Sequence, residues 1–570
     1  MSIMELYDNW CQKAVDDPDL QTELLSIKGN DVEIRDRFYR DLEFGTGGLR
    51  GVIGAGSNRM NIYTIRRATQ GLANYVKASF ENPSVAISYD SRIKSVAFAQ
   101  AAAAVLAGNG IKVHIYSELM PTPCLSWAVR ALHCSAGIMV TASHNPSKYN
   151  GYKAYGADGC QMTLEAAERV LSEINSLDMF EDVTYADFDQ AVTDGMIAYI
   201  EQSVIEEYYK NVLAQGIHTD LCADSGLKIV YTPLNGTGNK PVREVLSRIG
   251  IQDVTVVKEQ ENPDGNFPTC PYPNPEIREA LELGLKYCDE IKPDLLLATD
   301  PDADRVGIAV PDGDDYALFS GNEVGALLLE YICSQRKANG TLPENPICVK
   351  TIVTTDLVRK IANEYGLETI EVLTGFKFIG EQIGLLEEKN QENRYVFGFE
   401  ESYGYLAGSY VRDKDAVVAS MLICEMAAYY RTQGISLLQA RENLYRKYGV
   451  FRHSLQSFAF EGESGMNKMN SLMQELRNNR PETIGGLKVV SVSDYITSET
   501  LDITSGQKTP ITLPKSNVLV FDLEQGAKVV IRPSGTEPKI KSYYTTIGTT
   551  MEEALATEQK LKNDFSKIFQ

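Results

Sequence analysis

VAISYDSRIKSVAFAQAAAAVLAGNGIKVHIY, residues 85–116, predicts a strand, a helix and a second strand in succession. The apolar run 85–89 is followed by turn residues, and a helical pattern begins near Ser95 and stops at Gly108-Asn109-Gly110. Residues 111–116 then alternate between apolar and polar side chains, as a strand does. The stretch is therefore expected to form a β-α-β unit, the building block of parallel sheets.

The same pattern recurs twice, at residues 227–258 and 347–373, and each unit is followed by a further strand-like run. After about Phe451 the pattern changes to a polar helix, several strands and a final helix. We therefore expect an α/β protein with three related mixed α/β domains and a smaller α+β C-terminal domain, arranged around a central cleft. The expected domains are residues 1–220, 221–338, 339–450 and 451–570.

Length and charge narrow the class of protein. The 570 residues correspond to roughly four domains at about 150 residues each. The 55 Lys and Arg against 77 Asp and Glu give a net charge of −22, which argues against nucleic acid or an anionic membrane as a partner. The N-terminus resembles no signal peptide, and the ten cysteines form no C-x-x-C pair, so a cytoplasmic protein with reduced thiols is expected.

Chemistry is expected in the loops that leave the carboxyl ends of the strands. The first is Thr141-Ala142-Ser143-His144-Asn145-Pro146, after the strand-like run 137–140. It places a hydroxyl beside an imidazole, which suits a nucleophile, although a serine and histidine in a loop are more often only a turn. No G-x-S-x-G motif surrounds Ser143, which argues against an α/β-hydrolase.

The second loop, Asp300-Pro301-Asp302-Ala303-Asp304-Arg305, follows an apolar strand. Three carboxylates at alternate positions repel each other unless a cation lies among them, so a hard divalent ion is indicated, with a solvated acidic turn as the alternative. An EF-hand is excluded, because its sixth position would be Arg305 and its twelfth Pro311. The open coordination suits Mg²⁺ that shares a phosphate oxygen.

Three further loops are weaker signals when taken alone. Residues 398–404 place Glu400 and Ser402 between glycines, which suits sugar hydroxyls. Residues 532–539 combine an arginine, two hydroxyls, a glycine and a lysine, as a phosphate-binding loop does. Residues 44–51 are glycine-rich but match neither the P-loop nor the dinucleotide fingerprint, so ATP and dinucleotide binding are not supported.

In this order, the loops resemble the α-D-phosphohexomutase family, and the resemblance runs from about Gly45 to Lys541. Its motifs at 45–51 and 398–402 are similar to the branch that contains phosphoglucomutases and phosphopentomutases. The resemblance implies that Ser143 carries a transferable phosphoryl group and that its oxygen completes a Mg²⁺ site with Asp300, Asp302 and Asp304. It also implies that Lys153 is the acid/base, that Arg50 lies near the reacting oxygen, and that His144 flanks the phosphoserine.

The resemblance implies a substrate-binding set as well. Glu400 and Ser402 match the pair that contacts sugar hydroxyls in both substrate orientations, and the loop at 532–539 matches the one that binds the non-reacting phosphate. The full set is Arg305, Thr374, Gly375, Lys377, Glu400, Ser402, Lys414, Arg532, Ser534, Gly535, Thr536 and Lys539. Phe399 and Phe376 differ from some relatives, and both lie in the sugar-reading region.

The implied reaction interconverts glucose 1-phosphate and glucose 6-phosphate. Phosphoserine would donate its phosphoryl group to the sugar phosphate, glucose 1,6-bisphosphate would form and turn over, and the other phosphate would return to Ser143. Mg²⁺ and the bisphosphate are the expected cofactors, sugar phosphates the expected partners, and the chain is expected to be a monomer or a homodimer. Pentose phosphate, mannose phosphate and bisphosphate synthesis stay open as alternatives.

Two other classes use the same residues differently. A metal-dependent sugar phosphatase would release phosphate, and the intact loop at 532–539 argues against it. A non-catalytic sugar-phosphate sensor would be expected to lack Ser143, an aspartate or Lys153, and all of these are present.

Overall fold

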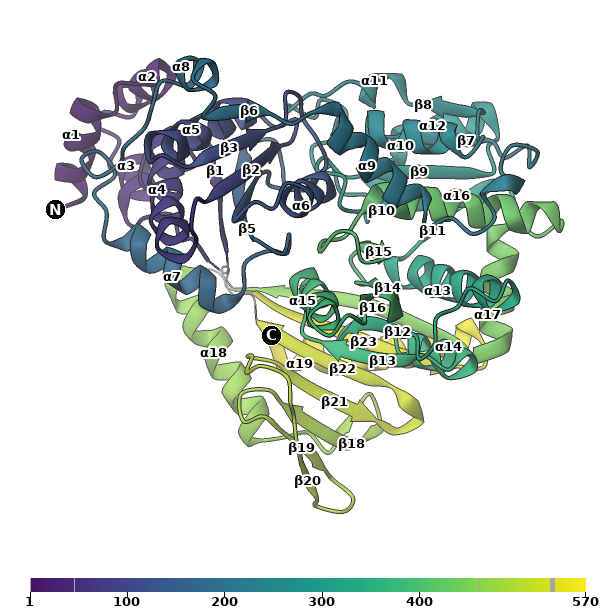
Figure 1. Ribbon diagram of the computed structural model, residues 1–570. Helices are drawn as coiled ribbons and strands as arrows, with labels where there is room; N and C mark the ends of the chain where they lie inside the picture. Colours follow the sequence, from purple (N-terminus) through teal and green to yellow (C-terminus); the bar gives the residue numbers. More distant parts are fainter. Residues whose placement is uncertain (1, 46, 461, 534–538, 570) are drawn as a thin grey trace. The chain divides into compact units, whose positions relative to one another are not determined.

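The computed structural model describes residues 2–45, 47–460, 462–533 and 539–569 (Figure 1). The chain divides into two compact units. The first contains the residues up to Val324 together with Phe376–Ser436, and the second contains Gly325–Gly375 and Leu437 onward. The four domain boundaries expected above stay a prediction.

The first sheet is built around the stretch at 85–116. Strand β2 (Ser84–Tyr89), helix α5 (Ser95–Gly108) and strand β3 (Lys112–Ile115) form where the pattern predicts them, and β2 pairs in parallel with β3. The order of the sheet is β1-β5-β4-β2-β3-β6. Its remaining strands are β1 (Gly48–Val52), β4 (Ala136–Val140), β5 (Tyr149–Gly156) and β6 (Ile197–Tyr199). Strand β4 is parallel to β2, whereas β5 is antiparallel to both β4 and β1.

Helix α5 is alanine-rich and almost wholly buried, because it packs against α4 (Ile62–Ser79) as well as against β2 and β3. A helix that is apolar on nearly all sides is stable only when it is covered on all sides. Helix α6 (Thr122–Ala131) packs on β2 and β4, and α7 (Leu164–Asn175) packs on α4. The remaining helices of this region are α1 (Ile3–Lys13), α2 (Pro18–Ser26), α3 (Asp31–Phe38), α8 (Phe188–Thr193), α9 (Gln202–Leu213) and the short η1 (Thr219–Leu221).

The second sheet has the order β11-β10-β9-β7-β8, and β9 (Leu295–Thr299) at its centre is buried along its whole length. Strands β7 (Ile229–Thr232), β8 (Val254–Val256) and β9 are parallel, and β10 (Val306–Asp312) and β11 (Asp315–Phe319) are antiparallel additions. Its helices are α10 (Asn239–Arg248), α11 (Lys258–Glu261) and α12 (Arg278–Ile291). The first unit also contains α15 (Phe376–Glu387), η2 (Glu392–Arg394), β14 (Tyr395–Phe399), β15 (Tyr405–Ala407) and α16 (Ala416–Thr432).

In the second unit, β12 (Ile347–Thr351) pairs in parallel with β13 (Glu368–Val372), and α14 (Leu357–Tyr365) joins them, as the third sequence repeat predicts. The unit begins within α13 (Gly321–Ala338) and resumes at α17 (Leu437–Tyr448). Lys350 of β12 is fully buried, and its Nζ lies 3.2 Å from Asp356 Oδ1 and 2.8 Å from Glu371 Oε2. Lys528 lies 2.6 Å from Asp356 Oδ2, so these charges tie the α/β part of the unit to its C-terminal sheet.

The C-terminal sheet is antiparallel, in the order β16-β23-β22-β21-β18-β19-β20, with β17 beside β18. Its strands are β16 (Val450–Ala459), β17 (Thr483–Ile484), β18 (Leu487–Asp494), β19 (Glu499–Asp502), β20 (Lys508–Pro510), β21 (Leu519–Leu523), β22 (Lys528–Pro533) and β23 (Lys539–Gly548). Helices α18 (Gly462–Asn478) and α19 (Met551–Phe569) and the turn η3 (Glu524–Gly526) complete it. Phe521, Val529 and Phe565 lie in its buried core.

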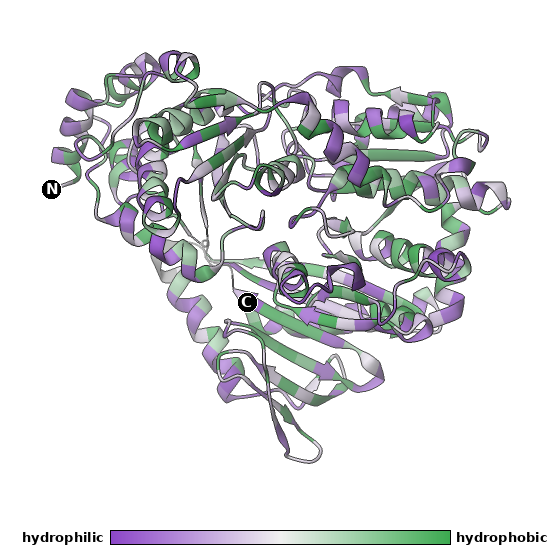
Figure 2. Ribbon diagram, viewed as in Figure 1, coloured by the Kyte–Doolittle hydropathy of each residue, from purple (hydrophilic) through white to green (hydrophobic). Residues whose placement is uncertain are grey.

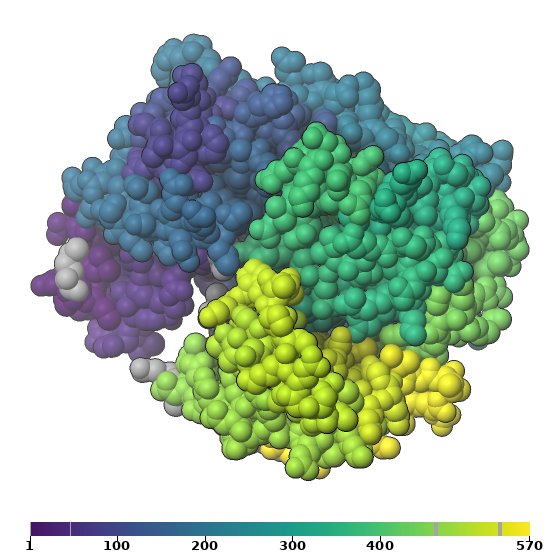
Figure 3. Space-filling model, turned by 60° about the horizontal axis from the view of Figure 1, so that its bottom comes forward, coloured from purple at the N-terminus to yellow at the C-terminus, as the bar shows by residue number. Residues whose placement is uncertain are grey.

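Hydropathy follows this architecture. The strands of the sheets are largely green in Figure 2, whereas many helices have both purple and green residues, as expected of helices that cover a sheet on one face. The hairpin of β19 and β20 projects from the C-terminal sheet in Figure 1, and its yellow-green residues lie in the foreground of Figure 3. Among the described residues, no helix combines the length and the apolar character needed to cross a bilayer.

Candidate active site

Ser143 lies in the loop that directly follows β4, and its side chain is directed at the acidic loop of the second sheet. Its Oγ donates a hydrogen bond to Asp300 Oδ2 at 2.8 Å and lies 3.3 Å from His144 Nδ1. The residue is 3% exposed and has a φ of +52°, in the left-handed region that non-glycine residues seldom adopt. The serine loop and the acidic loop, which are far apart in sequence, therefore meet at the Ser143 hydroxyl.

The acidic loop follows β9, and it presents its three carboxylates to one point. One oxygen each from Asp300, Asp302 and Asp304 lies within 4.8 Å of the other two, and all three residues are buried. In the described part of the chain, this is the single group of three or more His, Cys, Asp or Glu side chains placed to hold a metal ion. The backbone N–H groups of Asp304 and Arg305 donate to Asp300 Oδ1 at 3.1 and 2.9 Å, which fixes the turn.

Two lysines neutralise the acidic loop. Lys153 lies on β5 opposite Met139 of β4, and its Nζ is 2.9 Å from Asp302 Oδ2 and 3.4 Å from Asp304 Oδ2. Lys414, just before α16, has its Nζ 2.9 Å from Asp304 Oδ2. Burial alone would lower the pKa of Lys153, but Asp302 and Asp304 outweigh it and raise that pKa. The negative charges beside Lys153 thus stabilise the protonated form of its ammonium group.

The donor set fits a hard divalent cation. Burial would raise the pKa of Asp302, yet Lys153 and the neighbouring groups hold it well below its usual range. The pKa of Asp300 moves the other way, because burial and then the charges of Asp304 and Asp302 raise it. Oδ1 of Asp302 and Oδ1 of Asp304 are buried and have no hydrogen-bond partner among the described residues. Such oxygens are the ligands that Mg²⁺ prefers.

Positive charge also surrounds the serine. Arg305 Nη1 lies 2.5 Å from Glu276 Oε1 at the edge of the acidic loop. Burial, reinforced by the charges of Arg305 and Arg50, holds the pKa of His144 well below its usual range, so its ring is neutral near pH 7. Arg50 is opposite Gly151 in the pairing of β1 with β5, and the residue as a whole is exposed. Desolvation of its guanidinium lowers the pKa of that group, against the opposing effect of the Asp302 charge.

The loop after β14 brings Glu400 near these charges. Glu400 is 5% exposed, its backbone N–H donates to the Gly404 carbonyl at 2.9 Å, and its carboxylate contributes to raising the pKa of Lys414 against the effect of burial. A Cβ on Gly404 would lie 2.4 Å from Cδ of Lys414, so the glycine leaves room for that lysine. Ser402 is half-buried in the same loop.

The other predicted substrate residues are distributed over both units. Lys377 lies in the first turn of α15 in the first unit, and Thr374 and Gly375 follow β13 in the second. Arg532 lies on β22 opposite Lys541, and Lys539 begins β23 opposite Ala459. Ser534, Gly535 and Thr536 lie outside the described residues. The convergence of these residues on the acidic loop stays a prediction.

Sequence reasoning missed several residues that support the site. Thr122 donates to Asp302 Oδ2 at 2.9 Å, and Tyr155 donates to Asp413 Oδ2 at 2.7 Å beside Lys414. Arg92 donates to the backbone of the serine loop. One signal could have found Arg92, because the segment 90–92 follows the carboxyl end of β2 and combines an aspartate with an arginine.

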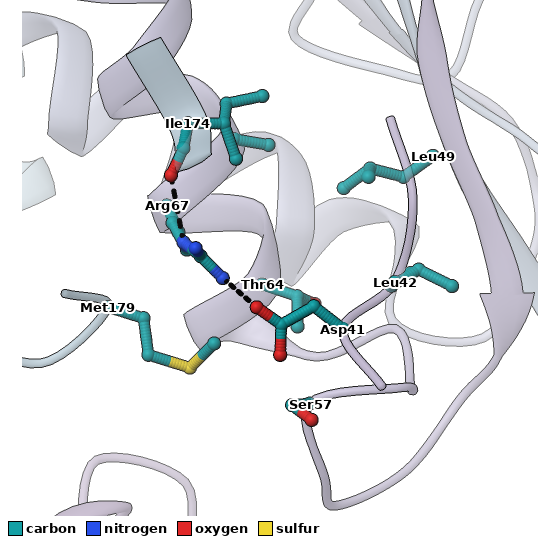
Figure 4. Close-up of a pocket in the computed structure, with 9 residues that line it drawn as sticks. Asp41, Leu42, Leu49, Ser57, Thr64, Arg67, Ile174 and Met179 are labelled. Carbon is teal, nitrogen blue, oxygen red and sulfur yellow. Dashed lines mark hydrogen bonds and ion pairs between the residues drawn. The ribbon is translucent and has the colours of Figure 1, made fainter. Parts of the chain in front are cut away.

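A separate recess lies beside α4, lined by Asp41, Leu42, Leu49, Ser57, Thr64, Arg67, Ala68, Ile174 and Met179 (Figure 4). Arg67 spans it, with Nη1 2.6 Å from Asp41 Oδ2 and Nε donating to the Ile174 carbonyl at 3.1 Å. None of the residues predicted for the active site lines this recess. The arginine and aspartate within it already satisfy each other.

The fold and the site define a multidomain α/β protein in which a serine hydroxyl is held against an acidic metal-binding loop. The chain belongs to the phosphoglucomutase/phosphomannomutase family. Family models match its α/β/α domain I at residues 41–180, domain II at 206–313 and domain III at 320–448. These matches, followed by the antiparallel C-terminal sheet, confirm the predicted fold class and the predicted family.

Relatives and solved structures agree with this assignment. A phosphoglucomutase of Staphylococcus saprophyticus is 38% identical over 88% of this chain and 90% of its own, and one of Staphylococcus aureus is 39% identical over 90% and 91%. The structure of a phosphoglucomutase from Paramecium, in an open form, superposes with a TM-score of 0.69 at 17% identity, covering 93% of this chain and 96% of that one. A Burkholderia thailandensis protein of the same family gives a TM-score of 0.66, also at 17% identity, over 92% and 96%. The structural likeness is one of fold.

Proposed function

We propose that this chain is a phosphosugar mutase that interconverts glucose 1-phosphate and glucose 6-phosphate through a phosphoserine at Ser143. The observation that carries the proposal is the hydrogen bond from Ser143 Oγ to Asp300 within a buried group of three aspartates. A phosphoryl group on that oxygen would lie against the acidic loop, and a bound cation would reduce the repulsion between them. The phosphoglucomutases with 38% and 39% identity over most of this chain support glucose as the sugar.

Mg²⁺ is the metal that we propose for the acidic loop. Asp300, Asp302, Asp304 and the Ser143 oxygen would hold it, and their buried carboxylate oxygens fit a hard cation. When bound, the ion supplies charge neutralisation for the transferring phosphoryl group, which is the main requirement of phosphoryl transfer. We expect the protein to be cytoplasmic, and a monomer or a homodimer.

The surrounding side chains divide the remaining tasks. Lys153 holds a proton at Nζ beside the acidic loop, which suits exchange with the reacting sugar hydroxyl. The neutral ring of His144 next to Ser143 can accept the hydroxyl proton, and Arg50 adds a positive charge for the phosphoryl oxygens. Glu400 and Ser402 would contact the sugar hydroxyls.

The non-reacting phosphate requires a second site. We propose that Arg532, Ser534, Gly535, Thr536 and Lys539 bind it, assisted by Arg305, Lys414, Thr374, Gly375 and Lys377. Glucose 1,6-bisphosphate would form as the intermediate, turn over and return its other phosphate to Ser143, so a catalytic amount of it should activate the enzyme. Closure of the C-terminal domain would exclude water, which prevents hydrolysis of the phosphoserine.

A comparison of substrates tests the proposal. Initial rates would be measured with glucose 1-phosphate, mannose 1-phosphate and ribose 1-phosphate, each with Mg²⁺ and a catalytic amount of the matching bisphosphate. We expect kcat/KM for glucose 1-phosphate to exceed the others by about tenfold or more, since the sugar loop discriminates through hydroxyl contacts. Comparable values would contradict glucose as the preferred sugar, and a preference for ribose or mannose would favour the corresponding alternative. Release of inorganic phosphate without isomerisation would favour a phosphatase.

A further inference from the structure

Arg92 is a fully buried arginine around which the serine loop is folded. It follows the end of β2, and its guanidinium donates hydrogen bonds to four backbone carbonyls of one short segment. Those carbonyls belong to Ser143 at 2.5 Å, to Pro146 and Tyr149 at 3.0 Å each, and to Asn145 through a shorter contact. The positive charge of the Arg92 guanidinium thus stabilises four carbonyl oxygens that would otherwise repel one another.

Asp90 completes the arrangement from the other side of the serine. Its Oδ2 lies 3.3 Å from Arg92 Nε and accepts a hydrogen bond from Thr141 Oγ1 at 2.6 Å. Thr141 Oγ1 in turn accepts a hydrogen bond from the Ser143 backbone N–H at 2.8 Å. The Asp90 and Arg92 side chains are both 0% exposed, and Ser95 Oγ donates to the second carboxylate oxygen of Asp90 at 2.8 Å.

Both polar backbone atoms of Ser143 are therefore held by this pair, its carbonyl by Arg92 and its N–H through Thr141 by Asp90. The restraint matters because a φ of +52° is costly for a residue with a side chain and persists only where the surroundings impose it. This conformation directs Oγ to Asp300. The ring of Phe267 lies 5.1 Å from the Arg92 guanidinium, which adds a further fixed contact.

We propose that Arg92, together with Asp90 and Thr141, is a positioning residue that holds the Ser143 backbone so that its oxygen is aligned for phosphoryl transfer. Arg92 donates to backbone carbonyls of the serine loop, so its effect passes through the backbone of Ser143. The inference rests on the proposed phosphoserine function. It goes beyond that function by assigning the alignment of the nucleophile to residues that lie outside the metal and sugar loops.

The test is the separation of kcat from KM in Arg92→Lys. Lysine keeps the charge but cannot reach four carbonyls with one ammonium group, so the serine loop would lose its fixed alignment. We expect kcat with glucose 1-phosphate to fall by about 100-fold, the effect of a misplacement of about 1 Å, while KM changes by less than about threefold. Affinity for Mg²⁺, measured calorimetrically, should fall far less than kcat, because the three aspartate ligands are untouched and only the Ser143 oxygen is displaced.

Arg67→Lys is the matched control. Arg67 is a mostly buried arginine of the same part of the chain, bonded to an aspartate and to a backbone carbonyl, and it is not part of the proposed site (Figure 4). We expect the melting temperature to fall by a similar amount in both variants. The kcat of Arg67→Lys should stay within about twofold of wild type, whereas that of Arg92→Lys should not. Equal kcat in the two variants, after correction for the folded fraction, would overturn the inference.

Thr141→Val provides a second route if Arg92→Lys does not fold. It keeps the shape of the side chain and the Arg92–Asp90 pair, and removes the two hydrogen bonds that link Asp90 to the Ser143 N–H. We expect kcat to fall by about tenfold with KM unchanged. Wild-type kcat in a folded Thr141→Val protein would contradict the inference. A wild-type chain that does not isomerise sugar phosphates would instead contradict the proposed function.

Discussion

The backbone of Ser143 is held on both sides while its hydroxyl faces three carboxylates. This arrangement separates two requirements of phosphoryl transfer, a fixed nucleophile and a neutralised charge. The first is met by hydrogen bonds to the backbone of the serine loop. The second is prepared by Lys153 and Lys414, which balance the carboxylates of the acidic loop within the folded chain. The lysines contact the Oδ2 atoms of Asp302 and Asp304, so a divalent ion could bind the unpartnered Oδ1 atoms of the same carboxylates.

Replacement of a metal ligand tests the assignment of the acidic loop as the metal site. In Asp302→Asn the acidic loop loses one negative charge and one strong oxygen ligand, so we expect its affinity for Mg²⁺ to fall by at least about tenfold. Calorimetric titration with Mg²⁺ alone measures this directly. Asp315→Asn is the control, because Asp315 is an exposed residue paired with Arg278, and it should bind Mg²⁺ as wild type does. Equal affinity in the two variants would contradict the assignment of the loop.

At the scale of the element, the strand and helix patterns predicted the architecture well. Strands β2, β9 and β12 and the helices that follow β2 and β12 form where apolar runs and turn residues place them. The helices α1 to α3 and the hairpin of β19 and β20 were not predicted, because their sequences are largely polar and short. The acidic loop was predicted from its own spacing, whereas Arg92 was not, because its partners are backbone carbonyls that leave no pattern in the sequence.

A buried histidine on strand β16, His453, should make the stability of the protein depend on pH. His453 on this strand donates to or accepts from Thr545 Oγ1 at 3.1 Å, and its Nε2 is buried without a hydrogen-bond partner among the described residues. Burial lowers the pKa of His453 to about 3, and the nearby Lys350 and Arg452 act in the same direction, against Asp356. The folded state thus keeps the ring neutral, whereas the unfolded chain takes up a proton as the pH falls below about 6.5. The stability associated with the neutral ring is complete above that pH and is lost progressively down to about pH 3.

We expect His453→Gln to be less sensitive to acid than wild type. Between pH 6.5 and 5, the free energy of unfolding of wild type should fall by about 1.5 kcal/mol more than that of the variant. Urea titrations at the two pH values, followed by circular dichroism, measure this difference. His133→Asn, at an exposed histidine, should behave as wild type does. An equal loss in His453→Gln and wild type would show that the ring is protonated in the folded state.

At the scale of the whole molecule, the order of the loops along the chain identified the family before any contact was known. Composition alone was misleading, because a net charge of −22 suggests a poor site for an anionic substrate. The electrostatic potential near the acidic loop differs from what the net charge suggests. Four basic residues from segments far apart in sequence lie in one region of the first unit, namely Arg50, Lys153, Arg305 and Lys414. Sequence patterns do not show such convergence, which depends on how strands of different sheets are brought together.

The same net charge should make stability depend on salt. At about 0.01 M ionic strength the Debye length is about 30 Å, so the acidic side chains, which are in excess, repel one another across the molecule. At about 0.15 M the Debye length is about 8 Å, and this repulsion is largely screened. We expect the melting temperature to rise by a few degrees over this range of sodium chloride, because screening relieves repulsion more than it weakens ion pairs. A decrease would show that ion pairs such as those of Lys350 and Lys528 dominate instead.

The comparison of wild type with Ser143→Ala tests the central claim most directly. Both proteins, shown to be folded by circular dichroism, would be given glucose 1-phosphate, Mg²⁺ and a catalytic amount of glucose 1,6-bisphosphate, and formation of glucose 6-phosphate would be followed. Because the phosphoryl group must pass through the serine oxygen, we predict many turnovers for wild type and a rate lower by at least about 1,000-fold for Ser143→Ala. Isomerisation at a comparable rate by the folded variant would contradict the phosphoserine mechanism.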